Sequence, residues 1–162
     1  MSNVPSISTI ESLLRNVMDP EIPVLSIMDL GVITDIRTDT SKVYIEMTPT
    51  FVGCPAIDMI KSEISAALYE YGIPAVEINV TFRVPWTSDR ISETGRAALK
   101  KFWLSPPAKN VLHSDLEILG SVACPRCDGT NTTMKTLFGQ TLCRSIHFCN
   151  DCREAFEQFK TI

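Results

Sequence analysis

Hydrophobic residues recur every three or four positions in three stretches of the chain, which is the spacing of an amphipathic helix. These stretches cover residues 7–17, 57–71 and 88–102. Pro20 follows the first stretch and Gly72 follows the second, and both residue types commonly end a helix. We therefore predict three helices at these positions.

Hydrophobic residues occupy every second position from Val76 to Phe82, the pattern of a strand with one buried face. Residues 32–37 and 43–47 predict two more strands, joined by the polar turn TDTS. Residues 19–31 contain two prolines and predict a loop. The order helix, two strands, helix, strand, helix predicts an α+β fold, with a small mixed sheet and helices on one face.

The segment SPPAKN, residues 105–110, interrupts these patterns. Residues 120–162 contain too little hydrophobic material to hold a core without a cross-link. We therefore expect an α+β domain over residues 1–104, a linker over 105–119, and a C-terminal β unit over 120–162.

Two C-x-x-C pairs, CPRC and CNDC, lie in the C-terminal part of the chain. Each pair can present two thiolates to one ion, and two pairs complete a tetrahedron of sulfurs around zinc. Clustered cysteines favour metal over disulfides in a chain without secretion signals. We predict a zinc-ribbon-like site, with an iron–sulfur cluster at the same thiolates as the alternative. The predicted ligands are Cys124, Cys127, Cys149 and Cys152.

Cys143 is left outside these pairs, and His147 lies two residues before Cys149. A free cysteine often packs as a small hydrophobic residue. We favour that interpretation because four sulfurs already complete a site. A role for Cys143 as an additional ligand, together with His147, stays open.

Cys54 lies far before the other cysteines, in the segment TPTFVGCPA. Pro55 suits the first position of the helix that follows. Cys54 would then lie at or next to the N-cap, where unpaired N–H groups and the helix dipole lower the pKa of a thiol. We therefore expect an ionised and reachable thiolate, which is both a nucleophile and a metal ligand.

Four polar residues are candidates to surround this thiol. Thr48 and Thr50 stand at the end of the preceding strand, and Asp19 and Glu21 lie on the loop after the first helix. Nearby carboxylates raise the pKa of a thiol, so their convergence on Cys54 would favour a bound cation. The alternative is a buried cap residue at Cys54, with Asp19 only ending the first helix.

The composition narrows the class of protein. Of the 162 residues, 44% are hydrophobic and 21% are charged, which is typical of a globular protein. The net charge is −4 and no dense Lys/Arg cluster occurs, so we do not expect nucleic acid as a partner. No apolar run is long enough for a bilayer, and the N-terminus does not read as a signal peptide. We therefore expect a cytoplasmic protein without a membrane partner.

The stretches DPEIPVLSIMDLGVI and TPTFVGCPA resemble the metal–sulfur cluster biosynthetic domain of SufT-like proteins. In that family a cysteine precedes a proline, as Cys54 does here. The stretch PWTSDRISETGRAALKKFWLSPP and the cysteine-rich tail are similar to one branch, the PaaD family of phenylacetate-degradation proteins. Cys143 answers to a cysteine that is usual at that place in the branch.

The resemblance implies a function and a site. The expected function is assembly or maturation of an iron–sulfur centre for the multicomponent phenylacetyl-CoA epoxidase, without catalytic activity of its own. Cys54 would hold iron or an iron–sulfur cluster transiently, and Asp19, Glu21, Thr48 and Thr50 would tune its thiol. The expected partners are subunits of the epoxidase, above all its reductase, and the iron–sulfur assembly machinery. A homodimer is compatible with this interpretation.

Two functions of other classes stay open. The first is a non-catalytic zinc-ribbon scaffold within the same oxygenase complex. The second is an enzyme that uses Cys54 as its nucleophile. The second is weaker, because a thiol nucleophile usually has a histidine base, and His113 and His147 are both remote in the sequence.

Overall fold

The computed structural model describes residues 4–109 and 122–161, and His113 and most of the expected linker lie outside these ranges. The chain divides into two compact units, residues 1–86 and 87–162. The predicted α+β fold class is confirmed, since the first unit combines helices with a three-stranded sheet and the second contains a four-stranded sheet. Within the described ranges, no helix combines the length and the apolar character that crossing a bilayer requires.

The sheet of the first unit is mixed. Its strands are β1 (Ile33–Thr38), β2 (Val43–Met47) and β3 (Val76–Val80), with β2 in the centre. β2 pairs antiparallel with β1 and parallel with β3, which places Ile45 opposite Ile36 on one side and Ile78 on the other. The parallel pair needs a crossover connection, and the long helix between β2 and β3 supplies it.

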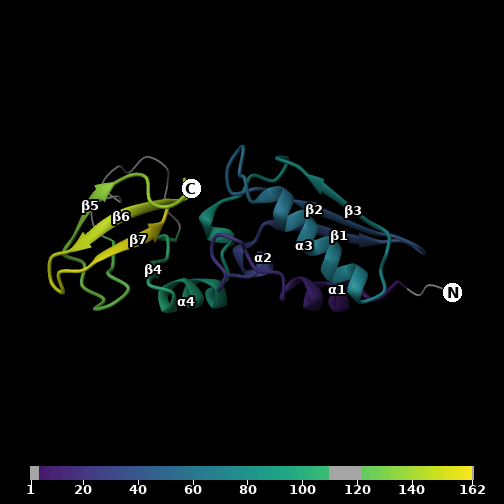
Figure 1. The fold of residues 1–162 in the computed structure, drawn as a ribbon, viewed down its shortest axis with the longest axis horizontal. Helices are drawn as coiled ribbons and strands as arrows, with labels where there is room; N and C mark the ends of the chain where they lie inside the picture. Colours follow the sequence, from purple (N-terminus) through teal and green to yellow (C-terminus); the bar gives the residue numbers. More distant parts are fainter. Residues whose placement is uncertain (1–3, 110–121, 162) are drawn as a thin grey trace. The chain divides into compact units, whose positions relative to one another are not determined.

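The helices of the first unit are α1 (Ile7–Leu14), α2 (Ile27–Leu30) and α3 (Ile57–Glu70). Figure 1 shows α3 lying along the face of the sheet formed by β1, β2 and β3. α3 buries Ile60, Ile64 and Leu68, which recur every four residues and therefore lie on one face of the helix. α1 contacts both α3 and β1. These helices and the inward side of β2 form the core of the unit.

The element boundaries correct several expectations. The loop expected over residues 19–31 contains α2, because the Ser26 hydroxyl caps the Asp29 N–H and Gly31, with a φ of 75°, ends the turn. The first helix ends at Leu14 rather than at residue 17. β3 ends at Val80, which leaves Phe82 exposed instead of on the buried face.

The second unit contains a 3₁₀ turn (Ser88–Arg90), α4 (Glu93–Lys101) and the strands β4 (Leu104–Ser105), β5 (Thr132–Thr136), β6 (Arg144–Cys149) and β7 (Ala155–Phe159). The strand order is β4-β7-β6-β5, antiparallel except for β4, which pairs parallel with β7. The helix expected over 88–102 is therefore shorter. Its N-cap is Ser92, whose hydroxyl accepts the Gly95 N–H.

The Arg96 side chain links several segments at the start of the second unit by hydrogen bonds. Its buried guanidinium donates to the carbonyl oxygens of Ser88, Ile91 and Pro107, at 2.7, 3.3 and 2.5 Å. One side chain thus ties the 3₁₀ turn and the segment after β4 to α4. The contacts group α4 and β4 with the C-terminal sheet. The domain boundaries expected at residues 104, 119 and 120 stay predictions.

The packing of α3 yields a stability prediction. Ile64 is fully buried, so Ile64→Ala is expected to lower the free energy of unfolding of the first unit by about 2–5 kcal/mol. Tyr69→Ala, on the exposed side of the same helix, is the control and is expected to cost about 0.5 kcal/mol or less. Urea unfolding followed through amide signals of β2 reports on this unit alone. Equal effects of the two substitutions would contradict the assigned face of α3.

Candidate functional site

Cys54 lies on the connection between β2 and α3. α3 begins at Ile57 with Ala56 as its N-cap, so the expectation that Pro55 is the first helical residue is wrong. Cys54 instead stands two residues before the N-cap, and its carbonyl accepts the Ile57 N–H at 3.4 Å. Gly53 adopts a φ of 79°, a left-handed conformation that turns the chain just before the thiol.

The pKa of the Cys54 thiol is raised, not lowered as the helix position had suggested. Partial burial is the largest cause, the Ala56 N–H opposes it, the carboxylates of Glu21 and Asp19 add to it, and the Thr50 hydroxyl opposes it. One N–H and one hydroxyl are outweighed by desolvation and two negative charges. The raised pKa contradicts the expected lowering of the pKa and disfavours an ionised thiolate, although the residue is partly exposed as expected.

Asp19 is held by the backbone of its own loop. It is 8% exposed, and its Oδ1 accepts the N–H groups of Glu21 and Ile22, each at 2.8 Å. These bonds shape the turn that brings both carboxylates within electrostatic reach of Cys54. Their role in a functional site stays a prediction.

Thr48 lies at the end of β2 and is completely buried. Its N–H donates to the Val32 carbonyl at 2.8 Å, while its Oγ1 has no hydrogen-bond partner among the described residues. A buried hydroxyl without a partner costs free energy, so it marks a position that packing alone does not explain. The structure thus places Thr50, Asp19 and Glu21 around Cys54 and leaves Thr48 as a buried polar atom of the same strand end.

The four predicted metal ligands lie together in the second unit. The sulfurs of Cys124, Cys127, Cys149 and Cys152 are all within 4.8 Å of one another. Two of the sulfur–sulfur distances are 3.7 Å and 3.5 Å. A tetrahedral ion with bonds of about 2.3 Å would space its sulfurs by about 3.8 Å. The donor set therefore fits one metal ion.

The two C-x-x-C loops share one hydrogen-bond pattern. The N–H of Asp128 donates to the Cys124 carbonyl, and the N–H of Arg153 donates to the Cys149 carbonyl, both at 2.9 Å. Asp128 and Arg153 each follow the second cysteine of a pair, and they have φ values of 59° and 62°. Each pair is thus held in its turn by local backbone geometry.

The thiols of this group differ widely in pKa. The N–H groups of Cys152 and Asp151 lower the pKa of Cys149 to about 7. Burial and the neighbouring sulfurs raise the pKa of Cys152 to about 12. Close thiolates repel one another, and a bound metal removes that penalty. The electrostatics of the group therefore favour metal binding.

Cys143 and His147 lie outside the group of four. Cys143 is buried with its sulfur 3.0 Å from the Thr141 hydroxyl. His147 is buried, stacks on Phe156 with ring centroids 5.6 Å apart, and lies 3.0 Å from the Ser145 hydroxyl. Burial lowers the pKa of this imidazole. Both contacts agree with a packing role.

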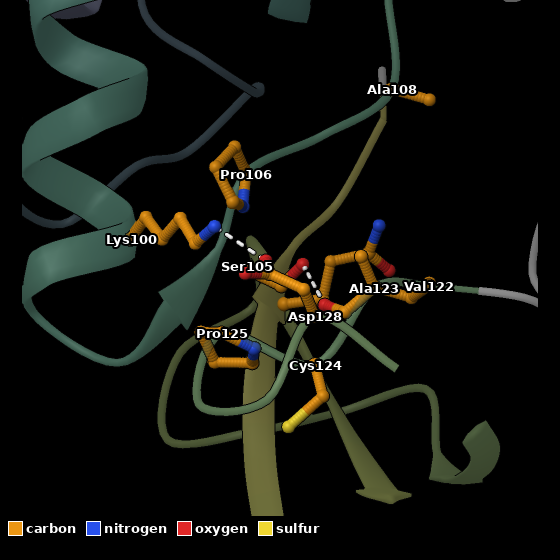
Figure 2. Close-up of a pocket in the computed structure, with 10 residues that line it drawn as sticks. Lys100, Ser105, Pro106, Ala108, Val122, Ala123, Cys124, Pro125 and Asp128 are labelled. Atoms are coloured by element: carbon orange, nitrogen blue, oxygen red, sulfur yellow. Dashed lines mark hydrogen bonds and ion pairs between the residues drawn. The ribbon is translucent and has the colours of Figure 1, made fainter. Parts of the chain in front are cut away.

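A small pocket of about 280 Å³ adjoins the CPRC loop. Lys100 pairs with Asp128 there, and the Ser105 hydroxyl donates to the Ala123 carbonyl at 2.9 Å. Figure 2 shows the sulfur of Cys124 directed away from Lys100. These contacts thus support the CPRC loop on the side opposite the Cys124 sulfur. Sequence spacing contained no signal for this support, which depends on α4 and β4 packing beside the loop.

Two family models match the chain. One is described as an iron–sulfur cluster assembly protein and matches residues 7–81, and the other is the PaaD zinc beta ribbon domain, matching residues 108–160. Solved structures agree for the first part. A DUF59 domain from Bacillus anthracis has a TM-score of 0.53 and 30% identity, covering 57% of this chain and 89% of that one. A hypothetical protein from Thermotoga maritima has a TM-score of 0.52 and 35% identity, covering 63% and 98%.

The chain therefore combines an iron–sulfur assembly domain of the SufT type with a zinc ribbon. It is 36% identical over 158 residues to a protein of Escherichia coli K12 that is named as a subunit of 1,2-phenylacetyl-CoA epoxidase, covering 98% of this chain and 94% of that one. The chain belongs to this PaaD family. It is also 36% identical over 90 residues to the Fe-S protein maturation auxiliary factor YitW of Bacillus subtilis, covering 53% of this chain and 85% of that one.

The environment of Cys54 predicts its reactivity. Glu21→Gln is expected to accelerate alkylation of Cys54 at pH 7, because loss of the negative charge lowers the pKa of the thiol. In the unchanged protein the rate should keep rising above pH 9, since the pKa lies above its ordinary value of 9.0. Peptide-resolved mass spectrometry with iodoacetamide measures the rate. Glu11→Gln on α1 is the control, and equal rates in both variants would contradict the electrostatic assignment.

The four-sulfur group predicts a selective loss of metal. Cys149→Ser is expected to lose bound metal and to unfold the C-terminal sheet, because metal binding supplies folding free energy to such a site. Cys143→Ser, outside the group, is the control and should retain both metal and sheet. Metal analysis by plasma mass spectrometry and far-UV circular dichroism make the comparison. Retention of metal by Cys149→Ser would contradict this ligand set.

Proposed function

We propose that this protein assists the assembly or maturation of iron–sulfur clusters, with Cys54 as the thiol that transiently holds iron or a cluster. The observation that carries the proposal is the setting of this thiol. Cys54 is partly exposed, and partial burial together with the carboxylates of Glu21 and Asp19 raises the pKa of its thiol. A bound cation would favour the thiolate and offset the repulsion from Asp19 and Glu21.

The same setting suits a transient ligand better than a resident one. A single thiolate leaves a metal ion with an incomplete set of protein ligands, whereas structural sites are closed by four. Binding would release the thiol proton, and the raised pKa would favour its return when the cargo leaves. Asp19, already fixed by two N–H groups, would keep its charge in place through both steps.

The relatives supply the proposed client. The Escherichia coli relative is named as a subunit of 1,2-phenylacetyl-CoA epoxidase, and the shorter relatives are named as Fe-S maturation factors. We propose that this protein serves the same epoxidase system in the cytoplasm. Its reductase is the proposed client, because the reductase is the component expected to carry an iron–sulfur centre. The iron–sulfur assembly machinery would supply the cargo.

Zinc is the proposed metal of the C-terminal unit. The spacing of the four sulfurs matches a single tetrahedral ion. An iron–sulfur cluster distributes its thiolates over several irons, which would separate them further. Cys124 and Cys149 belong to a small buried cluster with Val122 and Phe156, so the ion would cross-link the centre of this unit.

A scaffold within the oxygenase complex is the second candidate function. It is favoured by exposed hydrophobic residues on the connection between β5 and β6, namely Leu137, Phe138 and Leu142. Such residues commonly contribute to protein–protein interfaces. The nucleophile alternative loses support, because the pKa of Cys54 is raised and His147 is buried against Phe156.

Replacement of Cys54 separates these candidates. Cys54→Ser is expected to reduce the iron–sulfur content of the reductase isolated from cells at least fivefold, because the cargo ligand is lost. Cys143→Ser is the control and should leave the content unchanged. Circular dichroism of the purified variants checks that both fold. Full cluster content with Cys54→Ser would reject delivery through this thiol and leave the scaffold function.

A further inference from the structure

A groove of about 530 Å³ runs along α3 in the first unit. Met59, Ala66 and Ala67 contribute from the helix, and Met18 and Pro20 contribute from the loop after α1. Met18 is 43% exposed and Met59 is 56% exposed, although both side chains are apolar. Methionines are frequent on surfaces that adapt to partners. This groove is distinct from the buried core face of the same helix.

The groove is bordered by negative charge. Asp19, Glu63 and Glu70 line it, and its described lining includes no lysine or arginine. Glu63 and Glu70 form no ion pair with the described residues. The charge extends beyond the groove, since residues 1–86 carry eleven Asp and Glu against five Lys and Arg. A partner that fits this surface is therefore apolar in the middle and basic at its edges.

The dimensions of the groove suit a helix. Its α3 residues run from Met59 to Glu70, a span of about 16 Å at 1.5 Å per residue, or three helical turns. The small side chains of Ala66 and Ala67 leave space in the middle of this stretch, so the backbone of a neighbouring helix can approach closely. An amphipathic helix that buries an apolar stripe in such a groove is a recurring mode of recognition.

We propose that this groove binds a basic amphipathic helix of a partner protein. The inference rests on the proposed function in one respect, because Asp19 belongs to both the groove and the surroundings of Cys54. A helix seated here would hold its protein next to the cargo thiol. A second copy presenting the same face is disfavoured, since it would oppose the same carboxylates.

A designed peptide tests the groove directly in the full-length, metal-loaded protein. The probe is a synthetic helix of four turns with a leucine stripe flanked by lysines, and a twin peptide carries glutamates instead. The lysine peptide is expected to perturb the amide signals of Met59, Glu63 and Ala66. The E63K/E70K variant is expected to bind it at least tenfold more weakly and to prefer the glutamate twin.

Charge reversal elsewhere in the same unit is the matched control. D35K/E77K changes the net charge equally, and both residues are exposed and lie outside the groove, each in one surface ion pair. This variant should bind the lysine peptide within a factor of two of the unchanged protein. Equal weakening by both variants, perturbations away from α3, or dimerisation through this face in sedimentation experiments would overturn the inference.

The same variants separate this inference from the proposed function. If Cys54→Ser leaves the client fully loaded while peptide binding stays specific to the groove, cluster delivery fails and the docking groove stands. If Cys54→Ser abolishes loading but E63K/E70K binds the peptide normally, the groove assignment fails and delivery stands. Cluster content of the client and peptide affinity are independent measurements, so neither outcome masks the other.

Discussion

The arrangement around Cys54 depends on the electrostatic conflict between a thiol and two carboxylates. The protein keeps Asp19 and Glu21 close to a sulfur whose ionised form they oppose. The backbone N–H groups that hold Asp19 show that the local loop geometry maintains this closeness. A bound cation would offset the repulsion and leave the thiolate in place. Protonation of the sulfur also removes the repulsion, but the neutral thiol is no longer a nucleophile or a metal ligand. This conflict is the physical basis for the proposal that Cys54 holds a cation transiently.

The two sulfur sites of the chain differ in the number of thiols that they offer to a metal ion. In the C-terminal unit, four sulfurs lie within 4.8 Å of one another, so one metal ion would bind all four and stabilise the fold. At Cys54, one thiol stands among oxygen atoms in a unit whose core of Ile45, Ile64 and Leu68 is independent of metal. Under the proposed function, the C-terminal unit would retain its metal ion and the first unit would release its cargo. Their charges differ as well, because residues 1–86 are strongly acidic and residues 87–162 carry more Lys and Arg than Asp and Glu.

Local patterns carried much of the prediction. The C-x-x-C spacing identified all four clustered cysteines, and β2 was predicted with the bounds that the structure shows. α2 was missed although its signals were present, since Ser26 and Gly31 are a good N-cap and a good C-terminal residue. Two prolines nearby obscured them. Asp19 and Glu21 were predicted as site residues from their place on the loop after the first helix, and the resemblance to SufT-like and PaaD proteins pointed to the same pair.

Features that depend on distant residues escaped prediction. β4 is only two residues long and exists because β7, some fifty residues later, pairs with it. α3 begins at Ile57, where the hydrophobic pattern begins, but Pro55 lies in the turn before the helix and no side chain caps Ala56. The raised pKa of Cys54 follows from burial and from carboxylates on another segment, neither of which neighbouring sequence encodes. The groove along α3 likewise requires the loop after α1 to be in place.

The matching turns at Asp128 and Arg153 have a consequence for how the C-terminal unit forms. Each C-x-x-C loop is closed by a hydrogen bond to the carbonyl of its own first cysteine, so neither loop needs the other for its turn geometry. The ion then has only to bring together two loops that already have the required turn. Removal of the ion should separate the two C-x-x-C loops while each keeps its own turn. Rebinding of metal would then be fast, because both loops already have the geometry that the site needs.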